Sequence, residues 1–394
     1  MIEPMSASSR FIPPGATLGV MGGGQLGRMF AHAAQQLGYF TAVLDPDPAS
    51  PAGWVAHHHI QAAYLDEQGL AQLMQRSAAI TTEFENVPAA ALVTLGAHRP
   101  VAPAADAVAI CQDRALEKAH FHRCEVPCAA HAVIESVEQL DAVDEATLLP
   151  GILKTSRLGY DGKGQARVTD RAELGAAWGT MKRVPCVLER RLDLAAEISV
   201  IVARSADGSL VHLPPQHNLH REGILAVTTV PAPGIDGALQ QQAIDAAARI
   251  AASMEYVGVL CVEFFVLRDG SLVANEMAPR PHNSGHYSID ACDISQFELQ
   301  VRTLTGAPLV QPRLHSPAVM LNLLGDLWFR GGDKEVEPDW AAVLALPGVH
   351  LHLYGKAQAR PGRKMGHLTV TADTAAHARD VALQVAARLG IEAF

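Results

Sequence analysis

Short apolar runs alternate with helical periodicity along the first hundred residues. Buried strands are predicted where four or five mainly apolar residues run together, at Thr17 to Met21, Phe40 to Leu44 and Ala79 to Thr82. Apolar positions at helical spacing cover Gln25 to Leu37 and Asp66 to Arg76 between these strands. Strands that alternate with helices indicate a parallel sheet of Rossmann-like type.

The rest of the chain is richer in strands. Helical patterns are predicted at Ala105 to Cys111, Asp113 to Cys124, Gly237 to Met254 and Ser295 to Leu304. Strands are predicted at Leu148 to Lys154, Cys186 to Glu189, Glu197 to Ala203, Leu210 to Leu213 and Ala318 to Leu324. This pattern indicates mixed α+β units after the first, α/β unit.

Composition narrows the class of protein. The 394 residues are 49% hydrophobic and 18% charged, which is typical of a globular protein with two or three domains. A formal net charge of −10 argues against a general nucleic-acid binder. No apolar run is long enough for a membrane span, and Met1 to Arg10 lacks the pattern of a secretion signal. Six cysteines without paired or zinc-type spacing favour a reducing, cytoplasmic location.

The stretch from Val262 to His286 reads as a β-hairpin around a two-residue turn at Asp269-Gly270. The turn predicts these opposite pairs: Arg268 with Ser271, Leu267 with Leu272, Phe265 with Ala274, and Glu263 with Glu276. A loop longer by one residue, or a bulge, would break this register.

Two carboxylates placed opposite each other need a cation or a shared proton. Mg²⁺ is the expected cation because it takes oxygen ligands between carboxylates and substrate phosphates. Asn275 beside Glu276 adds another oxygen ligand or a hydrogen-bond donor. The alternative is an ordinary hairpin with Glu263 and Glu276 at its solvated end.

Glycines after the first strand match a dinucleotide fingerprint. Gly22-x-Gly24-x-x-Gly27 opens the first helix, and Asp45 stands where such a site has its ribose-binding acid. The literal interpretation is an NAD site, although the physics requires only an anion at a helix N-terminus. The alternative is a tight turn without a ligand. Glu83 and Glu85 follow a later strand, where ligands bind parallel sheets, or simply open a helix.

Two of the three basic segments remain open to two interpretations. The loop from Thr155 to Gln165 is rich in glycine and carries a lysine, which favours phosphate wrapping over a plain hairpin loop, without Walker spacing. Arg114 and Lys118 share a helical face that by itself indicates a solvated surface. A basic cluster around a Pro-Gly turn indicates either an anion pocket or a charged hairpin tip: Lys356, Arg360, Arg363 and Lys364.

Together these segments resemble the ATP-grasp fold and, within it, 5-(carboxyamino)imidazole ribonucleotide synthase of purine biosynthesis. The resemblance rests on Gly22 to Met29, Thr82 to Pro88, Gly159 to Gln165 and Asn275 to His286, and it extends from about Thr17 to Ile391. It implies an α/β and α+β architecture in four units: a Rossmann-like domain over 1–105, a small lid subdomain with linker helices over 106–195, an ATP-grasp core with a metal-binding hairpin over 196–315, and a small C-terminal β-rich domain over 316–394.

The family activity implied is ATP- and bicarbonate-dependent carboxylation of 5-aminoimidazole ribonucleotide to N5-carboxyaminoimidazole ribonucleotide through carboxyphosphate. The resemblance implies that the protein uses ATP and Mg²⁺, with Mn²⁺ as a possible substitute. Its expected partners are small-molecule substrates, not nucleic acid or a membrane, and it is expected to form a homodimer. Another carboxylate–amine ligase, such as formate-dependent glycinamide ribonucleotide transformylase, is the alternative. An NAD-dependent dehydrogenase and a non-catalytic nucleotide-binding regulator are the rivals from other classes.

The resemblance also assigns roles to residues. It implies a nucleotide site made of Arg114 and Lys154 at the phosphates, the lid residues Gly159, Tyr160, Asp161, Gly162, Lys163, Gly164 and Gln165, the adenine hinge Glu189, Arg190, Arg191 and Leu192, then Glu197 at the ribose, and His220, Asn275 and Glu276. It implies Mg²⁺ on Glu263 and Glu276. The ribonucleotide is expected against Gly24, Gln25, Leu26, Glu83, Tyr160, Asp161, His282, Asn283 and Ser284, with its phosphate at Lys356 and Arg363. Lys154, Arg280 and His282 are the expected catalytic residues, and Arg190-Arg191 in the hinge leaves the side-chain contacts to adenine open.

Overall fold

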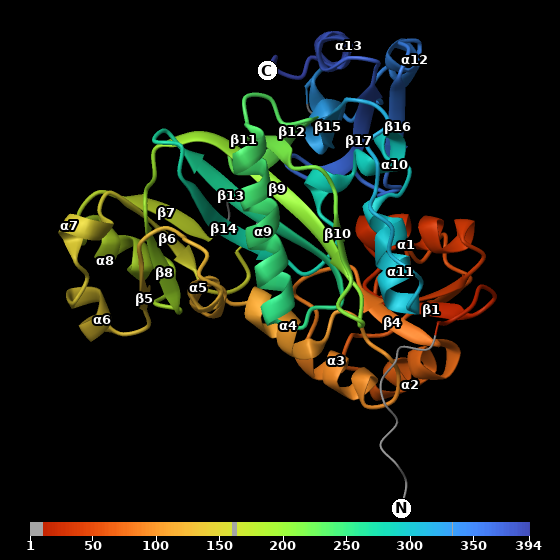
Figure 1. The fold of residues 1–394 in the computed structure, drawn as a ribbon, viewed down its shortest axis with the longest axis horizontal. Helices are drawn as coiled ribbons and strands as arrows, with labels where there is room; N and C mark the ends of the chain where they lie inside the picture. The colour runs from red at the N-terminus through yellow and green to blue at the C-terminus, as the bar shows by residue number, and fades with distance from the viewer. Residues whose placement is uncertain (1–10, 160–163, 333) are drawn as a thin grey trace, which may run out of the picture.

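Three β-sheets organise the described part of the chain, which comprises residues 11–159, 164–332 and 334–394 of this computed structural model (Figure 1). The N-terminal sheet and a small antiparallel sheet lie on opposite sides of a large third sheet (Figure 1). Among the described residues, no helix combines the length and hydrophobicity needed to cross a membrane.

The N-terminal sheet is parallel, as the alternation of strands and helices predicts. Its strands are β1 (Thr17–Met21), β2 (Phe40–Leu44), β3 (His58–Ile60) and β4 (Ala79–Thr82), in the order β3-β2-β1-β4. Its helices are α1 (Gln25–Gln36), α2 (Glu67–Arg76) and α3 (Ala89–Gly96). Because β1 and β4 are parallel neighbours, the glycine loop and Glu83 leave the sheet at the same edge.

Helices α4 (Ala105–Cys111) and α5 (Arg114–Arg123) lead to the small sheet. Its strands are β5 (His131–Ile134), β6 (Gly151–Thr155), β7 (Gln165–Val168) and β8 (Cys186–Arg190), in the order β5-β8-β6-β7, with helices α6 (Val137–Asp141), α7 (Glu145–Leu148) and α8 (Arg171–Thr180). The predicted start of β6 at Leu148 is wrong. Asp144 caps a short helix there through the Ala146 amide, and the strand begins only after Pro150.

The large sheet has nine strands in the described part of the chain. They are β9 (Leu194–Arg204), β10 (Leu210–His212), β11 (Gln216–Arg221), β12 (Ile224–Val230), β13 (Gly258–Leu267), β14 (Leu272–Ala278), β15 (Ala318–Leu324), β16 (Val349–Leu353) and β17 (Lys364–Thr371). Its helices are α9 (Gly237–Ser253), α10 (Ser288–Ala291), α11 (Gln296–Thr305), α12 (Trp340–Leu344) and α13 (Ala375–Leu389), with 3-10 turns η1 (Asn283–Gly285) and η2 (Gly325–Phe329). The order is β14-β13-β9-β11-β12-β15-β17-β16, and β10 pairs with β9.

Helix α9 covers one face of the strands that carry the predicted acids (Figure 1). Val200, Val262 and Phe264 point into the core beneath α9. Side chains alternate along a strand, so Glu263 and Ser199 point to the opposite face. That face is where a site can form.

The large sheet runs through the predicted boundary at residue 315. Strands β12 and β15 pair antiparallel, with Val227 opposite Leu321. The segment from 316 onward therefore extends the sheet that carries the acidic hairpin.

Candidate active site

The acidic hairpin closes with a three-residue loop. The Leu267 amide donates to the Ser271 carbonyl at 2.9 Å, and the Gly270 amide donates back to the Leu267 carbonyl at 2.9 Å. Gly270 has a φ of +85°, as the last position of such a loop requires. The predicted two-residue turn is therefore wrong, and so are its pairs nearest the loop. The observed pairs are Phe264 with Ala274, Phe265 with Val273 and Val266 with Leu272.

Glu263 nevertheless lies opposite Glu276, as predicted. A bulge at Asn275 adds one residue to β14 and cancels the offset that the longer loop introduces. The backbone carbonyl of Asn275 accepts a hydrogen bond from Lys118 Nζ at 2.6 Å. The buried Oδ1 atom of Asn275 has no hydrogen-bond partner.

A cavity of about 380 Å³ opens above these two carboxylates. Its walls come from the N-terminal domain, the linker helices, the hairpin and β17. The lining residues include Gln25, Leu26, Glu83, Glu85, Arg114, Glu117, Gly159, Glu263, Glu276, Arg280, His282, Asn283, His286 and Lys364. The cavity thus gathers residues that are up to 339 positions apart, from Gln25 to Lys364.

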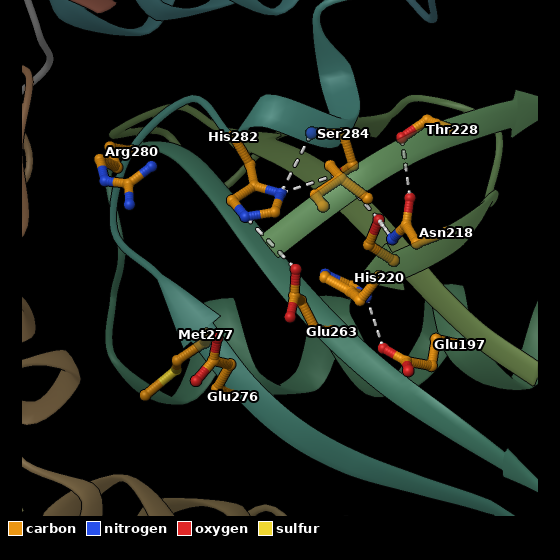
Figure 2. A network of polar contacts seen from close by, with 12 residues as sticks. Glu197, Asn218, His220, Thr228, Glu263, Glu276, Met277, Arg280, His282 and Ser284 are labelled. Atoms are coloured by element: carbon orange, nitrogen blue, oxygen red, sulfur yellow. Dashed lines mark hydrogen bonds and ion pairs between the residues drawn. The ribbon is translucent and has the colours of Figure 1, made fainter. Parts of the chain in front are cut away.

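The carboxylates of Glu263 and Glu276, both drawn in Figure 2, differ in their electrostatic surroundings. Burial and the neighbouring Glu276 raise the pKa of Glu263 to about 7. Burial also acts to raise the pKa of Glu276, but Arg114, at 3.1 Å, and Lys154 hold it below its ordinary value. The pair is a site for a cation, because a positive charge between the oxygens would relieve the repulsion.

A buried cluster of basic residues lies behind the pair. Lys154 and Lys118 contact the two carboxylate oxygens of Glu189 at 2.8 and 3.3 Å. Burial acts to raise the pKa of Glu189, but these lysines hold it at about 2. The prediction that Arg114 and Lys118 face solvent is wrong, since the Lys118 side chain is 0% exposed. Periodicity placed them on one face, but only the tertiary contacts show what that face meets.

A second cavity of about 340 Å³ lies between the small sheet and the hairpin. It is lined by Ala129, Ile152, Lys154, Arg167, Glu189, Arg190, Arg191, Leu192, Leu194 and Phe265. The amides of Arg190 and Arg191 donate to the carbonyls of Ala130 and Pro150 at 2.8 and 2.9 Å. Both arginine side chains are exposed. The predicted hinge segment therefore borders this second cavity. Lys154 and Glu189, which form the ion pair described above, line the cavity as well.

Glu197 and His220 form an ion pair on the face shared with Glu263 (Figure 2). His220 Nδ1 lies 2.7 Å from Glu197 Oε2, across neighbouring strands β9 and β11. Burial acts to lower the pKa of His220, but its contact with Glu197 and the charge of Glu263 raise it. The structure thus brings both predicted residues together.

The glycine loop binds carboxylates of its own chain. The amides of Gly24 and Gly27 donate to Glu83 at 3.1 and 3.3 Å, and the Gly23 amide donates to Asp45 at 2.6 Å. Asp45 is buried and also accepts a hydrogen bond from Tyr64 at 2.6 Å. The NAD interpretation is therefore wrong here, because Asp45 braces the loop and its carboxylate is not open to a ribose. Gln25 and Leu26, which follow the loop, do line the large cavity.

The segment after β14 supplies the far wall of the large cavity. Arg280 is ion-paired with Glu85 of the N-terminal domain. His282 Nε2 lies 3.3 Å from Glu263 Oε1 (Figure 2), and burial followed by the charge of Arg280 lowers the pKa of His282 well below its ordinary value. Asn283 is 7% exposed, and neither its Oδ1 nor its Nδ2 atom has a hydrogen-bond partner. Buried amides in native proteins are rarely left unsatisfied, so Asn283 is a candidate ligand contact.

The basic cluster at the Pro-Gly turn reaches the cavity through Lys364. Lys356 Nζ donates to the Lys364 carbonyl at 2.6 Å, and Arg363 donates to the Gln358 carbonyl at 2.8 Å. Neither Lys356 nor Arg363 is among the residues that line the cavity. Of the four basic residues around this turn, the family resemblance assigned Lys356 and Arg363 to the substrate phosphate, whereas Lys364 is the one that lines the cavity.

Glu117 and His286 also line the cavity and were missed. Burial raises the pKa of Glu117 to about 7, and its carboxylate accepts a hydrogen bond from the Met277 amide at 2.6 Å. Glu117 lies between Arg114 and Lys118 in sequence, but no spacing rule singles it out. The predicted lid residues Tyr160, Asp161, Gly162 and Lys163 lie outside the described residues. At the ends of that segment, Gly159 lines the cavity, and the Gly164 carbonyl accepts a hydrogen bond from the Thr155 amide at 2.8 Å.

Three family models match consecutive parts of the chain. They describe a ribonucleotide synthetase preATP-grasp domain over residues 15–112, an ATP-grasp domain over 119–297, and a phosphoribosylaminoimidazole carboxylase C-terminal domain over 318–381. Two relatives carry the name N5-carboxyaminoimidazole ribonucleotide synthase. The one from Brucella melitensis biotype 1 is 44% identical over 91% of this chain and 97% of its own length, and the one from Bacillus subtilis is 40% identical over 92% and 93%.

Solved structures agree with these matches. An N5-carboxyaminoimidazole ribonucleotide synthetase in its ADP complex is 39% identical, with a TM-score of 0.90 over 97% of this chain and 98% of that one. An N5-carboxyaminoimidazole synthase from Aspergillus clavatus, bound to ADP and the aminoimidazole ribonucleotide, is 30% identical, with a TM-score of 0.86 over 95% and 98%.

Proposed function

The chain belongs to the N5-carboxyaminoimidazole ribonucleotide synthase family, and we propose that its two cavities divide the substrates between them. It is an ATP-dependent ligase with the ATP-grasp fold. It carboxylates 5-aminoimidazole ribonucleotide to N5-carboxyaminoimidazole ribonucleotide in purine biosynthesis, with ATP and bicarbonate as the other substrates.

We propose that adenine occupies the smaller cavity and that the triphosphate extends toward the hairpin. The hinge from Glu189 to Leu192 borders that cavity, and Lys154, which is ion-paired with Glu189, also lines it. Lys154 and Arg114 would meet the phosphates, because the buried Lys154 and the partly buried Arg114 both place positive charge close to Glu276. Glu197, held by His220, would receive the ribose hydroxyls.

Glu263 and Glu276 would hold Mg²⁺. Two observations fit a hard cation at this place: like charges lie opposite each other, and the buried Asn275 Oδ1 lacks a partner. Bound there, the ion would neutralise charge on the phosphates of ATP. Without the ion, Arg114 already forms an ion pair with one of the two acids, Glu276.

We propose that the ribonucleotide occupies the larger cavity. Asn283, with its unsatisfied buried amide, is the strongest candidate contact, and Glu83 and His282 line the same space. Among the basic residues around the Pro-Gly turn, Lys364 is the one that would reach the sugar phosphate, with Lys356 and Arg363 behind it. A phosphate on the glycine-loop amides would have to displace Glu83.

The reaction proceeds in two transfers. Bicarbonate oxygen attacks the γ-phosphorus of ATP and releases ADP, which gives carboxyphosphate. The exocyclic amine of the ribonucleotide then takes the carboxyl group, directly or from released CO₂, while phosphate leaves and the amine loses a proton. Lys154 and Arg114 would stabilise the transferring phosphoryl charge. Holding the partners together supplies up to about 7–11 kcal/mol through effective molarity.

One observation carries this assignment: an acid pair faces a cavity while Arg114, Lys118 and Lys154 cluster behind it. The test is phosphate release from ATP with bicarbonate, with and without aminoimidazole ribonucleotide. Stimulation by that ribonucleotide is expected. Stimulation only by glycinamide ribonucleotide with formate would favour the transformylase, and ATP binding without phosphate release would favour a regulator.

Two further properties are proposed, the first from the family resemblance and the second from the cysteines. We propose a homodimer, which light scattering of the purified protein tests directly. We also propose a cytoplasmic location, because all six cysteines have free thiols, as a reducing compartment favours.

A further inference from the structure

A buried row of polar side chains leads from His282 across the large sheet (Figure 2). Thr228 Oγ1 donates to Asn218 Oδ1 at 3.0 Å, and Asn218 Nδ2 donates to Ser199 Oγ at 2.8 Å. Ser199 then donates to Ser284 Oγ at 2.8 Å, and Ser284 Oγ lies 2.8 Å from His282 Nδ1. We call these four residues, Thr228, Asn218, Ser199 and Ser284, the relay.

The direction of the relay is fixed at its His282 end. The backbone N–H of Ser284 can only donate, and it donates to His282 Nδ1 at 3.3 Å. Nδ1 is therefore an acceptor, so the Ser284 hydroxyl must also donate to it. Ser284 Oγ then accepts from Ser199, and Ser199 accepts from Asn218. Every hydrogen bond in the row follows from one backbone amide.

The other ring nitrogen of His282 must then carry the proton. Nε2 lies 3.3 Å from Glu263 Oε1, so this N–H faces the acid pair. Both serines and Asn218 are at most 3% exposed, and Ser199 and Asn218 line neither cavity. These residues therefore reach the reaction only through His282.

We propose that Asn218, Ser199 and Ser284 are positioning residues that hold His282 as its Nε2–H tautomer and aim it at Glu263. His282 then offers the larger cavity a hydrogen-bond donor and keeps one Glu263 oxygen oriented. It is not the base that takes the proton of the amine, since Nδ1 is occupied and Nε2 is already protonated. The proposal rests on the proposed function for its catalytic consequence, but not for the tautomer itself.

The tautomer is measured directly by the ring-nitrogen resonances of ¹⁵N-histidine-labelled protein. The His282 signals are identified by their loss in His282→Gln. We expect an unprotonated Nδ1 and a protonated Nε2 in the wild-type protein without substrates. A protonated Nδ1 would overturn the proposal whatever the activity of any variant, and this measurement needs no turnover.

Ser199→Ala interrupts the relay without touching either cavity. We expect kcat to fall about 10–100-fold, as for residues that orient a site residue from behind, with the KM for ATP unchanged and the Nδ1 resonance displaced. Thr228→Val is the matched control, because it removes a buried hydroxyl from the far end and leaves the bonds at His282 in place. Wild-type kcat and ring resonances in Ser199→Ala, or an equal loss of kcat in Thr228→Val, would refute the proposed role.

Ser284→Thr separates positioning from packing, because it keeps the hydroxyl that Ser284→Ala removes. We expect Ser284→Thr to keep most of the kcat that Ser284→Ala loses. Equal losses in both variants would contradict the hydrogen-bond role. If phosphate release were not stimulated by the aminoimidazole ribonucleotide at all, the proposed function would fail while the tautomer measurement still decided the relay.

Discussion

Glu263→Gln is expected to make the protein without ligands more stable while it abolishes turnover. Glu263 has a side chain that is 12% exposed and a pKa of about 7, because burial and Glu276 both oppose its negative charge. In the unfolded chain its pKa is about 4.5. The native state therefore keeps the Glu263 proton over a range in which the unfolded chain has lost it, and stability falls as pH rises from about 4.5 to 7.

Two estimates give the size of the effect. Side chains directly opposite have Cβ atoms roughly 5 Å apart, and two unit charges at that distance repel by about 3 kcal/mol at an effective dielectric constant near 20. The pKa of about 7 corresponds to a similar cost, about 3 kcal/mol. Glu276 is 41% exposed, so water screens part of this repulsion. We expect Glu263→Gln to gain about 2 kcal/mol at pH 8 and almost nothing at pH 4.5.

The assay is chemical unfolding of both proteins between pH 4.5 and 8.5, without nucleotide or metal. The exposed Glu335→Gln is the control for loss of one acid elsewhere, and its stability should follow the wild type at every pH. If the wild type and Glu263→Gln lose stability in parallel as pH rises, the two acids do not repel each other and the argument for a cation between them fails. Mg²⁺ with ADP should stabilise the wild type more than the variant.

Four other substitutions test the remaining parts of the site. Glu276→Gln should lower turnover at least a hundredfold with an unchanged circular dichroism spectrum, and residual activity above a tenth of wild type would contradict its role. Lys364→Ala should raise the KM for the ribonucleotide about tenfold and Lys356→Ala less; a rise only in the KM for ATP would contradict the pocket assignment. Lys118→Met should destabilise the protein by about 3 kcal/mol, because Glu189 stays buried with Lys154 alone, and equal denaturant midpoints would refute this.

In the hairpin, local sequence rules predict the position of the turn but not its length or the bulge. Asp269-Gly270 correctly marked a tight turn, but the loop takes Arg268 as well. That extra residue should have separated Glu263 from Glu276, and the bulge at Asn275 restores the pairing. A tight turn can be predicted from adjacent residues. A bulge depends on the partner strand and on tertiary contacts, such as that of Lys118 with the Asn275 carbonyl.

Side chains that meet across domains were the hardest to predict. Lys118 looked like a surface residue because helical periodicity says nothing about which element packs on that face. Glu83 lies at the edge of the N-terminal sheet, as expected. The hydrogen bonds that it accepts from the Gly24 and Gly27 amides could not be predicted from sequence spacing. The elements themselves were largely predictable, since buried strands such as Ala79–Thr82 and Ala318–Leu324 carry strong local signals.

The continuity of the large sheet past residue 315 limits how this enzyme can be shortened. A chain that stopped at residue 315 would lack β15, and β12 would present its unpaired amides and carbonyls along an exposed border. Val227 would lose the apolar neighbours Val319 and Leu321 at the same time. Such a fragment is a template for association with other chains, so the junction between the second and third matched regions is unsuitable as a cloning boundary.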